Sequence, residues 1–180
     1  MSRKPVVLFI DDELITLSKH IELLKERSFE LVEVGDSDSA IRQFKEYESS
    51  SFAAIDIVVI DMGMEPPKDG FGESGFMYHE ETGAHLLASL RTWDRGTRPV
   101  VIFSQLNEAD IVNPTMRAFE STMQVIGKPK NWKKNRSSSM SILQNQFKTW
   151  IVLKAEVGPV DFVDKIESIL SIKGIHSPLW

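Results

Sequence analysis

The sequence predicts an α/β fold built on a parallel sheet, and two observations indicate it. Short apolar runs rich in β-branched residues alternate with stretches in which apolar residues recur at helical spacing. Most of these runs have no polar interruption, as expected for strands that are covered on both faces. The predicted strands are Val6–Ile10, Phe29–Val34, Ile57–Ile60, Val100–Phe103 and Val125–Ile126. The second alternates apolar and polar residues, which predicts a more exposed position.

Apolar residues at helical spacing predict helices between these strands. The first contains Leu14, Leu17, Ile21 and Leu24, and the second contains Ala40, Ile41 and Phe44 behind a cap at Asp38 or Ser39. A third is expected to begin at Thr82, and a fourth to follow Pro114.

The composition fits one domain and excludes several classes of function. The chain has 180 residues, of which 42% are hydrophobic, enough for one core. A formal net charge of −5 leaves no overall basic surface, so direct nucleic-acid binding is not expected. The absence of cysteine excludes disulfides and thiolate catalysis. No apolar run is long enough for a signal peptide or a membrane span, and we expect a cytoplasmic protein.

Chemically useful side chains follow four of the predicted strands. Asp11 and Asp12 follow the first, Asp61 the third, Ser104 the fourth, and Lys128 the fifth. The carboxyl ends of parallel strands meet at one edge of a sheet, where ligands bind. Each residue alone has an ordinary explanation as a cap, a turn former or a solvated side chain. The set in this order predicts a site.

The three carboxylates would repel one another unless a cation occupied the cluster. Ligands that are all oxygen select a hard ion, and Mg²⁺ is bound through one or two carboxylates together with phosphate oxygens. We therefore expect Asp11, Asp12 and Asp61 to hold Mg²⁺.

These residues resemble the receiver domains of two-component response regulators, over roughly residues 5 to 130 and one C-terminal helix. The resemblance implies a flavodoxin-like, doubly wound five-stranded parallel sheet of order 2-1-3-4-5 with helices on both faces. It implies that Asp61 accepts a phosphoryl group, which Lys128 and Ser104 contact, and that the backbone carbonyl of Gly63 is a further Mg²⁺ ligand. It also implies a cis Lys128–Pro129 bond, for which an ordinary turn is the alternative.

Two positions depart from the family. Val125, three residues before Lys128, stands where an aromatic side chain commonly relays the switch, so that relay is in doubt. Gln105 stands where a small residue is common, and its bulk is expected to alter access to the phosphate.

Two additions distinguish the chain, which is otherwise expected to form one receiver domain over residues 1–180. The insertion 65–81 reads as a loop beside the site, either a flap, a partner contact or a segment tucked against the third helix. An insertion or extra helix spans 130–158 and begins with a basic patch at 130–136, interpreted as a linker or a docking surface for an acidic partner rather than a base-stacking site. The last receiver helix is either 138–153 or 160–172; an oligomeric role for the other, including a homodimer, stays open.

The functional prediction is a stand-alone receiver that takes a phosphoryl group on Asp61 from a sensor histidine kinase or phosphotransfer protein and signals by binding a downstream protein. It would not be an enzyme beyond Mg²⁺-dependent self-phosphorylation and self-dephosphorylation. The alternative is a pseudo-receiver, an interaction module that never takes phosphate. A phosphohydrolase is disfavoured because Gly63 stands where its second acid would be needed.

Overall fold

Five parallel strands form one sheet in the order β2-β1-β3-β4-β5. The computed structural model describes residues 3–46, 54–68, 79–128, 139–172 and 175. The strands are β1 (Val6–Ile10), β2 (Glu30–Val34), β3 (Ile57–Ile60), β4 (Val100–Ser104) and β5 (Thr149–Leu153). This order confirms the predicted flavodoxin-like sheet.

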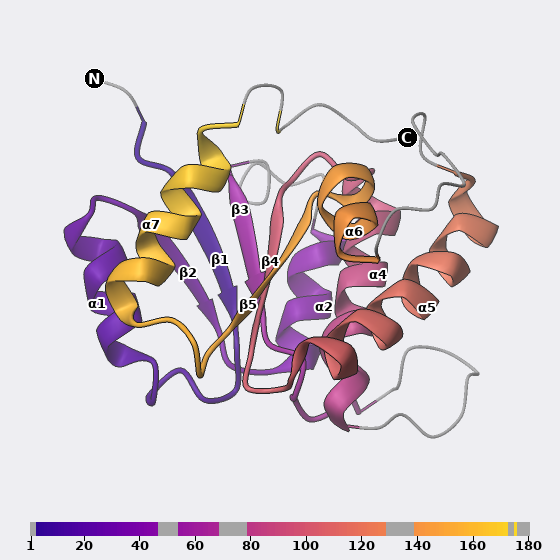
Figure 1. Ribbon diagram of the computed structural model, residues 1–180, viewed down its shortest axis with the longest axis horizontal. Coiled ribbons are helices and arrows are strands. Elements are labelled where there is room, and N and C mark those ends of the chain that lie inside the picture. Colours follow the sequence, from indigo (N-terminus) through magenta and orange to yellow (C-terminus); the bar gives the residue numbers. More distant parts are fainter. Residues whose placement is uncertain (1–2, 47–53, 69–78, 129–138, 173–174, 176–180) are drawn as a thin grey trace.

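Helices cover both faces of the sheet (Figure 1). On one face lie α1 (Ser18–Glu26) and α7 (Pro159–Leu170); on the other lie α2 (Ser37–Lys45), α4 (Thr82–Asp94), α5 (Glu108–Ile126) and α6 (Ser139–Phe147). A short 3-10 helix, η1 (His79–Glu81), leads into α4. Each face has its own apolar core, because alternate residues of each strand point to opposite sides.

The central strands are apolar because both of their faces are buried. Every residue of β1, β3 and β4 is buried, whereas Glu30 and Glu33 of β2 are exposed. The alternation in β2 thus marks an edge strand, as the sequence predicted. The cores that form on the two faces fix where the strands end, and therefore where the polar side chains that follow them lie.

The predicted fifth strand is wrong. Val125 and Ile126 are the last residues of α5, and Val125 is 78% exposed. The fifth strand is Thr149–Leu153, which lies inside the range 130–158 that was expected to follow the last strand. Lys148, the residue after α6, has a left-handed backbone with φ 47°. Because this conformation ends the helix, Phe147 and Trp150 belong to different elements, although their spacing in the sequence is helical. The last helix is consequently α7, not 138–153.

Two helix starts also differ from prediction. The cap of α2 is Asp36, whose carboxylate accepts a hydrogen bond from the Ser39 backbone N–H at 2.7 Å. In α5, Asn107 caps the helix and accepts from the Asp110 N–H at 3.1 Å, so Pro114 lies inside the helix instead of before it. Both caps satisfy N–H groups that have no partner within the helix. The predicted start of α4 at Thr82 is confirmed.

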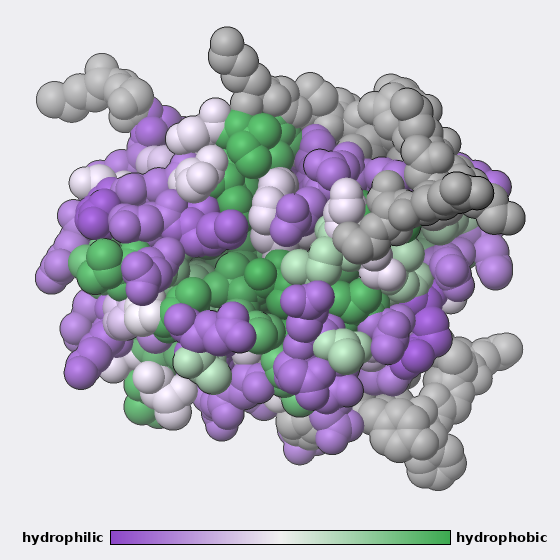
Figure 2. Space-filling model, viewed as in Figure 1, coloured by the Kyte–Doolittle hydropathy of each residue, from purple (hydrophilic) through white to green (hydrophobic). Residues whose placement is uncertain are grey.

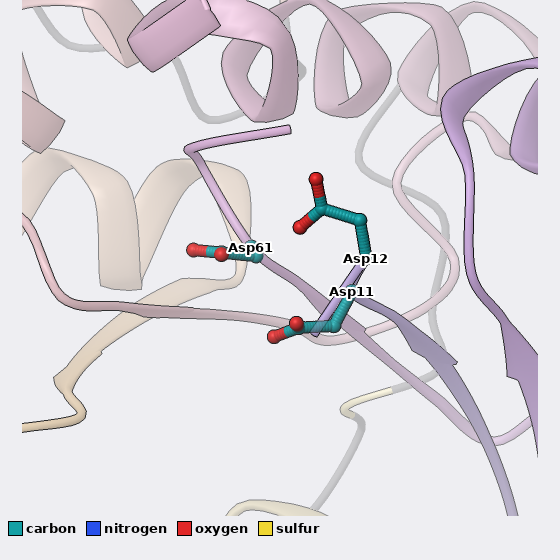
Figure 3. A group of neighbouring side chains, drawn as sticks. All are labelled: Asp11, Asp12 and Asp61. Carbon is teal, nitrogen blue, oxygen red and sulfur yellow. The ribbon is translucent and has the colours of Figure 1, made fainter. Parts of the chain in front are cut away.

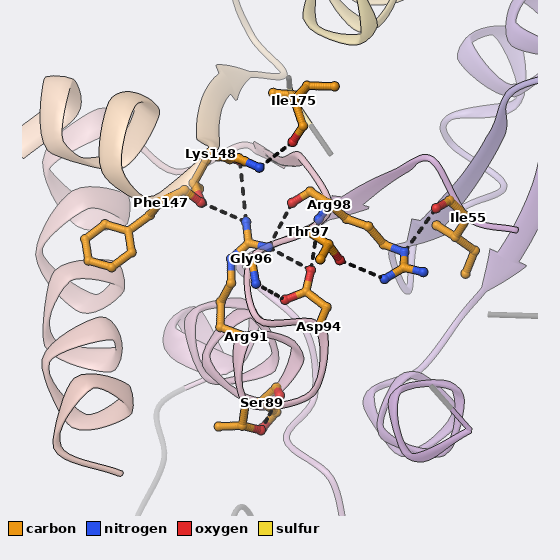
Figure 4. A network of polar contacts seen from close by, with 12 residues as sticks. Ile55, Ser89, Arg91, Asp94, Gly96, Thr97, Arg98, Phe147, Lys148 and Ile175 are labelled. Atoms are coloured by element: carbon orange, nitrogen blue, oxygen red, sulfur yellow. Dashed lines mark hydrogen bonds and ion pairs between the residues drawn. The ribbon is translucent and has the colours of Figure 1, made fainter. Parts of the chain in front are cut away.

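A buried polar network ties α4 to the start of β5 (Figure 4). The Arg91 guanidinium is fully buried and donates to the Asp94 carboxylate at 3.0 Å and to the carbonyls of Arg98 and Phe147, both at 2.8 Å. Lys148 donates from its amine to the Ile175 carbonyl. The Arg91 and Asp94 charges are stable in this interior because they form a hydrogen-bonded ion pair.

The strand β5 forms an edge of the sheet on the face shown in Figure 2, where apolar side chains gather between polar ones. A groove there is lined by residues of β5, α6, α7 and the loop before α7, among them Met140, Ile151, Leu153 and Val157. None of the helices in the described part of the chain combines the length and apolar content that a membrane span needs.

Several predictions fall outside the described residues. They are the aromatic part of the 65–81 insertion, the basic patch at 130–136 and the geometry of the Lys128–Pro129 bond. Within the insertion, the structure describes the segment 65–68 and the helix η1.

Candidate functional site

Three carboxylates meet where β1 and β3 end (Figure 3). Asp11 and Asp12 follow β1, and Asp61 follows β3. Each carboxylate offers an oxygen, and these oxygens lie within 4.8 Å of one another. Asp11 and Asp61 are buried, whereas Asp12 is exposed, so the cluster is open to solvent through Asp12. The structure thus brings together the three acids that the sequence singled out.

The sheet itself positions these acids. The Asp11 N–H donates to the Val34 carbonyl at 3.0 Å, and the Asp61 N–H donates to the Ile10 carbonyl at 2.9 Å, which continues the strand pairing one residue past the strands. The Asp11 carboxylate also accepts from the Glu13 N–H, and the Asp61 carboxylate from the Met62 N–H. Both carboxylates are therefore oriented by backbone donors.

The amine that contacts the acids is that of Lys154, not Lys128. Its Nζ lies 2.7 Å from Asp11 Oδ2 and 3.0 Å from Asp61 Oδ2. Lys154 is the first residue after β5, and Lys128 is an exposed residue just beyond α5. The assignment of Lys128 rested on a fifth strand that the structure does not place there, and we correct it to Lys154.

The sequence contained a signal for Lys154. The strand before it, β5, is rich in β-branched and aromatic residues, as the central strands are. Lys154 is followed by Ala155, whereas the resemblance implies a lysine followed by proline, a pair that occurs at Lys128–Pro129. The residue three before Lys154 is Ile151, which also lacks an aromatic ring. The aromatic residue that the resemblance implies three positions before the site lysine is therefore absent at the corrected position as well.

Burial and charge act on this site in opposite directions. Burial raises the pKa of Asp11, and the hydrogen bond from Lys154 offsets this effect only in part. Burial alone would lower the pKa of Lys154, but its hydrogen bond to Asp11 and the charges of Asp61 and Asp11 outweigh that and raise it. Lys154 is thus held as a cation between two buried carboxylates.

Aromatic rings close the site beneath Lys154. Its Nζ lies 5.7 Å from the centre of the Phe103 ring, within the range of a cation–π contact. The Phe103 and Phe162 rings pack with their centres 4.3 Å apart, and the His20 ring lies 5.4 Å from that of Phe103. Burial and then the Lys154 charge lower the pKa of His20. Lys154 therefore has an aromatic neighbour, Phe103, on one side and the two carboxylates on the other.

Ser104 ends β4, and Gln105 follows it, at the same edge of the sheet as the acids. Ser104 is 1% exposed, its carbonyl accepts from the Lys154 N–H at 2.8 Å, and its hydroxyl accepts from the Leu106 N–H at 3.4 Å. Gln105 donates to the exposed Glu13 carboxylate at 3.3 Å. Gly63 lies two residues past Asp61 and is half-buried. The strand order brings the ends of β1, β3, β4 and β5 to the same edge of the sheet.

The donor set fits a hard divalent cation. Every candidate ligand is an oxygen, and the three carboxylates carry one negative charge each against the single ammonium of Lys154. Two negative charges are therefore left without a balancing cation in a largely buried site, which an ion such as Mg²⁺ would neutralise. Asp11, Asp12, Asp61 and the Gly63 carbonyl are the groups that would hold it.

No family model matches the sequence, and no curated protein matches it. Solved structures do match the fold. A receiver domain protein from Methanospirillum hungatei is similar at a TM-score of 0.55 and 12% identity, over 93% of this chain and 94% of that one. A receiver protein from Sinorhizobium medicae is similar at a TM-score of 0.55 and 20% identity, over 93% of this chain and 95% of that one. A response regulator from Thermotoga maritima is similar at a TM-score of 0.56 and 14% identity, over 94% of this chain and all of that one. The chain therefore has the fold of CheY-like response-regulator receiver domains.

Proposed function

We propose that this protein is a cytoplasmic response regulator that accepts a phosphoryl group on Asp61, with Mg²⁺ as cofactor. The donor would be a phosphohistidine of a sensor histidine kinase or phosphotransfer protein, and the output a contact with a downstream protein. The observation that carries the proposal is the Lys154 ammonium bridging Asp11 and Asp61 beside the exposed Asp12.

Each residue then has a role in the transfer. A carboxylate oxygen of Asp61 bonds to phosphorus while the P–N bond to the donor imidazole breaks, and the imidazole leaves with the bonding electron pair and takes up a proton. The Met62 N–H holds the Asp61 carboxylate at 2.7 Å and fixes its direction. When bound, Mg²⁺ would neutralise charge on the phosphoryl oxygens. Lys154 stabilises the same charge from the buried side.

The switch follows from the new group. The phosphoryl group carries about −1.5 to −2 charge, which replaces the single negative charge of the Asp61 carboxylate, and it brings three acceptor oxygens next to Lys154 and Ser104. The Lys154 amine can exchange its bond to Asp61 Oδ2 for a phosphoryl oxygen, and the Ser104 hydroxyl can turn to donate. Charge-assisted hydrogen bonds contribute about 1.5–3 kcal/mol each, so a few of them provide the roughly 5.5 kcal/mol that a shift from 1% to 99% active requires.

The test is phosphorylation by a small donor. Wild-type protein incubated with Mg²⁺ and phosphoramidate is expected to gain one phosphoryl group by intact-mass spectrometry, which hydroxylamine removes as expected for an acyl phosphate. Asp61→Asn should gain none, because its amide is a poor nucleophile. A wild type that binds Mg²⁺ but stays unmodified would favour the alternative, a phosphorylation-independent interaction module.

A further inference from the structure

The segment that follows Asp61 is attached to neighbouring elements at three points. The Met62 carbonyl accepts from the Gly83 N–H at 3.1 Å, at the start of α4. The Glu65 carbonyl accepts from the Ser37 hydroxyl at 2.7 Å, and the Lys68 N–H donates to the Asp38 carboxylate at 3.2 Å. The segment thus runs between the first turns of two helices, α4 and α2.

The hydroxyl of Ser37 is not used to cap its own helix. That role belongs to Asp36, whose carboxylate accepts from the Ser39 N–H and hydroxyl, both at 2.7 Å. Ser37 is 3% exposed, and its hydroxyl instead reaches a carbonyl 28 positions further along the chain. A buried hydroxyl is costly without a partner, so the bond to Glu65 satisfies it and fixes the segment.

Gly63 lies between these attachments. It is one residue after Met62 and two before Glu65, and an added Cβ would meet nothing within 4 Å. Side-chain packing therefore does not set its position; the attached residues on either side do. A cavity of about 420 Å³ borders this segment and is lined by Asp12, Ser37 and Glu65, among others. The hydrogen bond from Ser37 to the Glu65 carbonyl, called the Ser37 clamp below, thus lies beside the acid cluster.

We propose that Ser37 is a positioning residue for the metal site: its bond to the Glu65 carbonyl holds the segment so that the Gly63 carbonyl faces the Asp11, Asp12 and Asp61 cluster. The inference rests on the proposed function, since it assigns a residue to the Mg²⁺ site of that function. Ser37 itself does not touch the ion; it acts through the backbone of the segment.

The expected effect of removing the hydroxyl is a modest loss of affinity. Ser37→Ala leaves the Glu65 carbonyl without this donor and lets the segment move away from the cluster. One net hydrogen bond corresponds to about a 3- to 10-fold change in an equilibrium constant, so Mg²⁺ should bind about 3- to 10-fold more weakly. At saturating Mg²⁺ the rate of phosphorylation by phosphoramidate should return close to the wild-type value, because the acceptor is intact.

The experiment is an MgCl₂ titration of ¹⁵N-labelled protein followed by amide chemical shifts, on wild type, Ser37→Ala and Ser39→Ala. Ser39→Ala is the matched control. It removes a hydroxyl from the same first turn of α2, one that donates to the Asp36 carboxylate of the helix cap and not to the Glu65 carbonyl. Thermal unfolding without Mg²⁺ then reports how much each substitution destabilises the fold.

The inference is supported if Ser37→Ala alone weakens Mg²⁺ binding and saturation restores phosphorylation. It is overturned if Ser37→Ala binds Mg²⁺ as the wild type does, or if Ser39→Ala shifts the affinity equally, since the cause would then be the stability of α2. A wild type that shows no Mg²⁺-dependent shifts would overturn the proposed function, and the inference with it.

Discussion

The Nζ atom of Lys154 lies 2.7 Å from the Asp11 carboxylate, a contact between residues 143 positions apart in the chain. The Lys154 side chain is 7% exposed and that of Asp11 is fully buried. Removing one partner of a buried ion pair leaves an uncompensated charge, which commonly costs about 3–5 kcal/mol. Lys154→Met is therefore expected to lower the free energy of unfolding by an amount of this order at pH 7, measured by urea denaturation.

The stability deficit of Lys154→Met is expected to depend on pH. Without Lys154, the pKa of the buried Asp11 rises further, and the native state binds more protons than the unfolded chain below neutral pH. The deficit of Lys154→Met should hence shrink as the pH falls from 7 to 5. Lys128→Met is the control, because it replaces an exposed residue, and its effect should stay within about 0.5 kcal/mol. Equal deficits for both variants would contradict the assignment of Lys154.

Gly83 is required by its close approach to the backbone of Asp61. A Cβ added at Gly83 would lie 2.1 Å from the Asp61 carbonyl oxygen and 2.7 Å from Met62 Cα. Backbone atoms cannot yield as a flexible side chain can, so Gly83→Ala should push α4 away from the acceptor and lower stability by about 1–3 kcal/mol. Helix propensity alone would predict the opposite sign. Urea denaturation measures the change, and the phosphorylation rate should fall with it.

Gly63→Ala provides the comparison for this prediction. A Cβ at Gly63 meets nothing within 4 Å, so alanine there should be neutral or stabilise by up to about 1 kcal/mol, through the lower entropy of the unfolded chain. If both alanine variants were neutral, the packing of α4 against Asp61 would be looser than the structure indicates.

The sequence predicts most of this fold because its signals are local. The uninterrupted apolar runs of β1, β3 and β4 and the alternation of β2 reflect how many faces of each strand are buried. The three acids are also predictable, since each directly follows such a run. The sheet order brings them together without any further information from the chain.

The fifth strand was missed because two local patterns compete there. Val125–Ile126 precedes a lysine and a proline, whereas Trp150–Leu153 continues a run of apolar residues at helical spacing that begins with Met140. What separates helix from strand is the left-handed backbone of Lys148, and lysine carries no sequence signal for that conformation. The Ser37 clamp could not be predicted either, because it joins a side chain to a backbone carbonyl 28 positions away.

Arg91 is expected to be a main source of stability at the end of the sheet opposite the acids. It donates to Asp94 and to the carbonyls of Arg98 and Phe147, and both it and Asp94 are fully buried. Arg91→Met would leave the buried Asp94 carboxylate without its ion-pair partner, with only backbone N–H donors, and should cost about 3–5 kcal/mol in urea denaturation. Arg27→Met is the control, since Arg27 forms exposed ion pairs that contribute at most about 1 kcal/mol. Similar losses in the two variants would contradict this account of the network.

Lys148 should make stability rise with pH above 8. Burial, together with the Arg91 charge, lowers its pKa to about 8 from the ordinary value of 10.5. Between these two values the unfolded chain holds the proton that the native state has lost, so the free energy of unfolding rises with pH, by at most about 1.4 kcal/mol per pH unit from this group. Below pH 8 the Lys148 amine is protonated in both the native and the unfolded state, so its contribution to the free energy of unfolding is constant. That contribution is unfavourable, because the native state buries the charge.

Lys148→Met removes the titrating amine and should abolish that rise, seen as a smaller difference between the urea midpoints at pH 8 and pH 10 than in the wild type. Lys165→Met, which replaces an exposed lysine of α7, should keep the wild-type difference. At pH 7 Lys148→Met removes a buried charge, which should stabilise the fold, but it also removes the hydrogen bond to the Ile175 carbonyl. The two effects oppose each other, so the pH dependence rather than the stability at one pH decides the role of Lys148. An unchanged pH dependence in Lys148→Met would show that its amine titrates alike in both states.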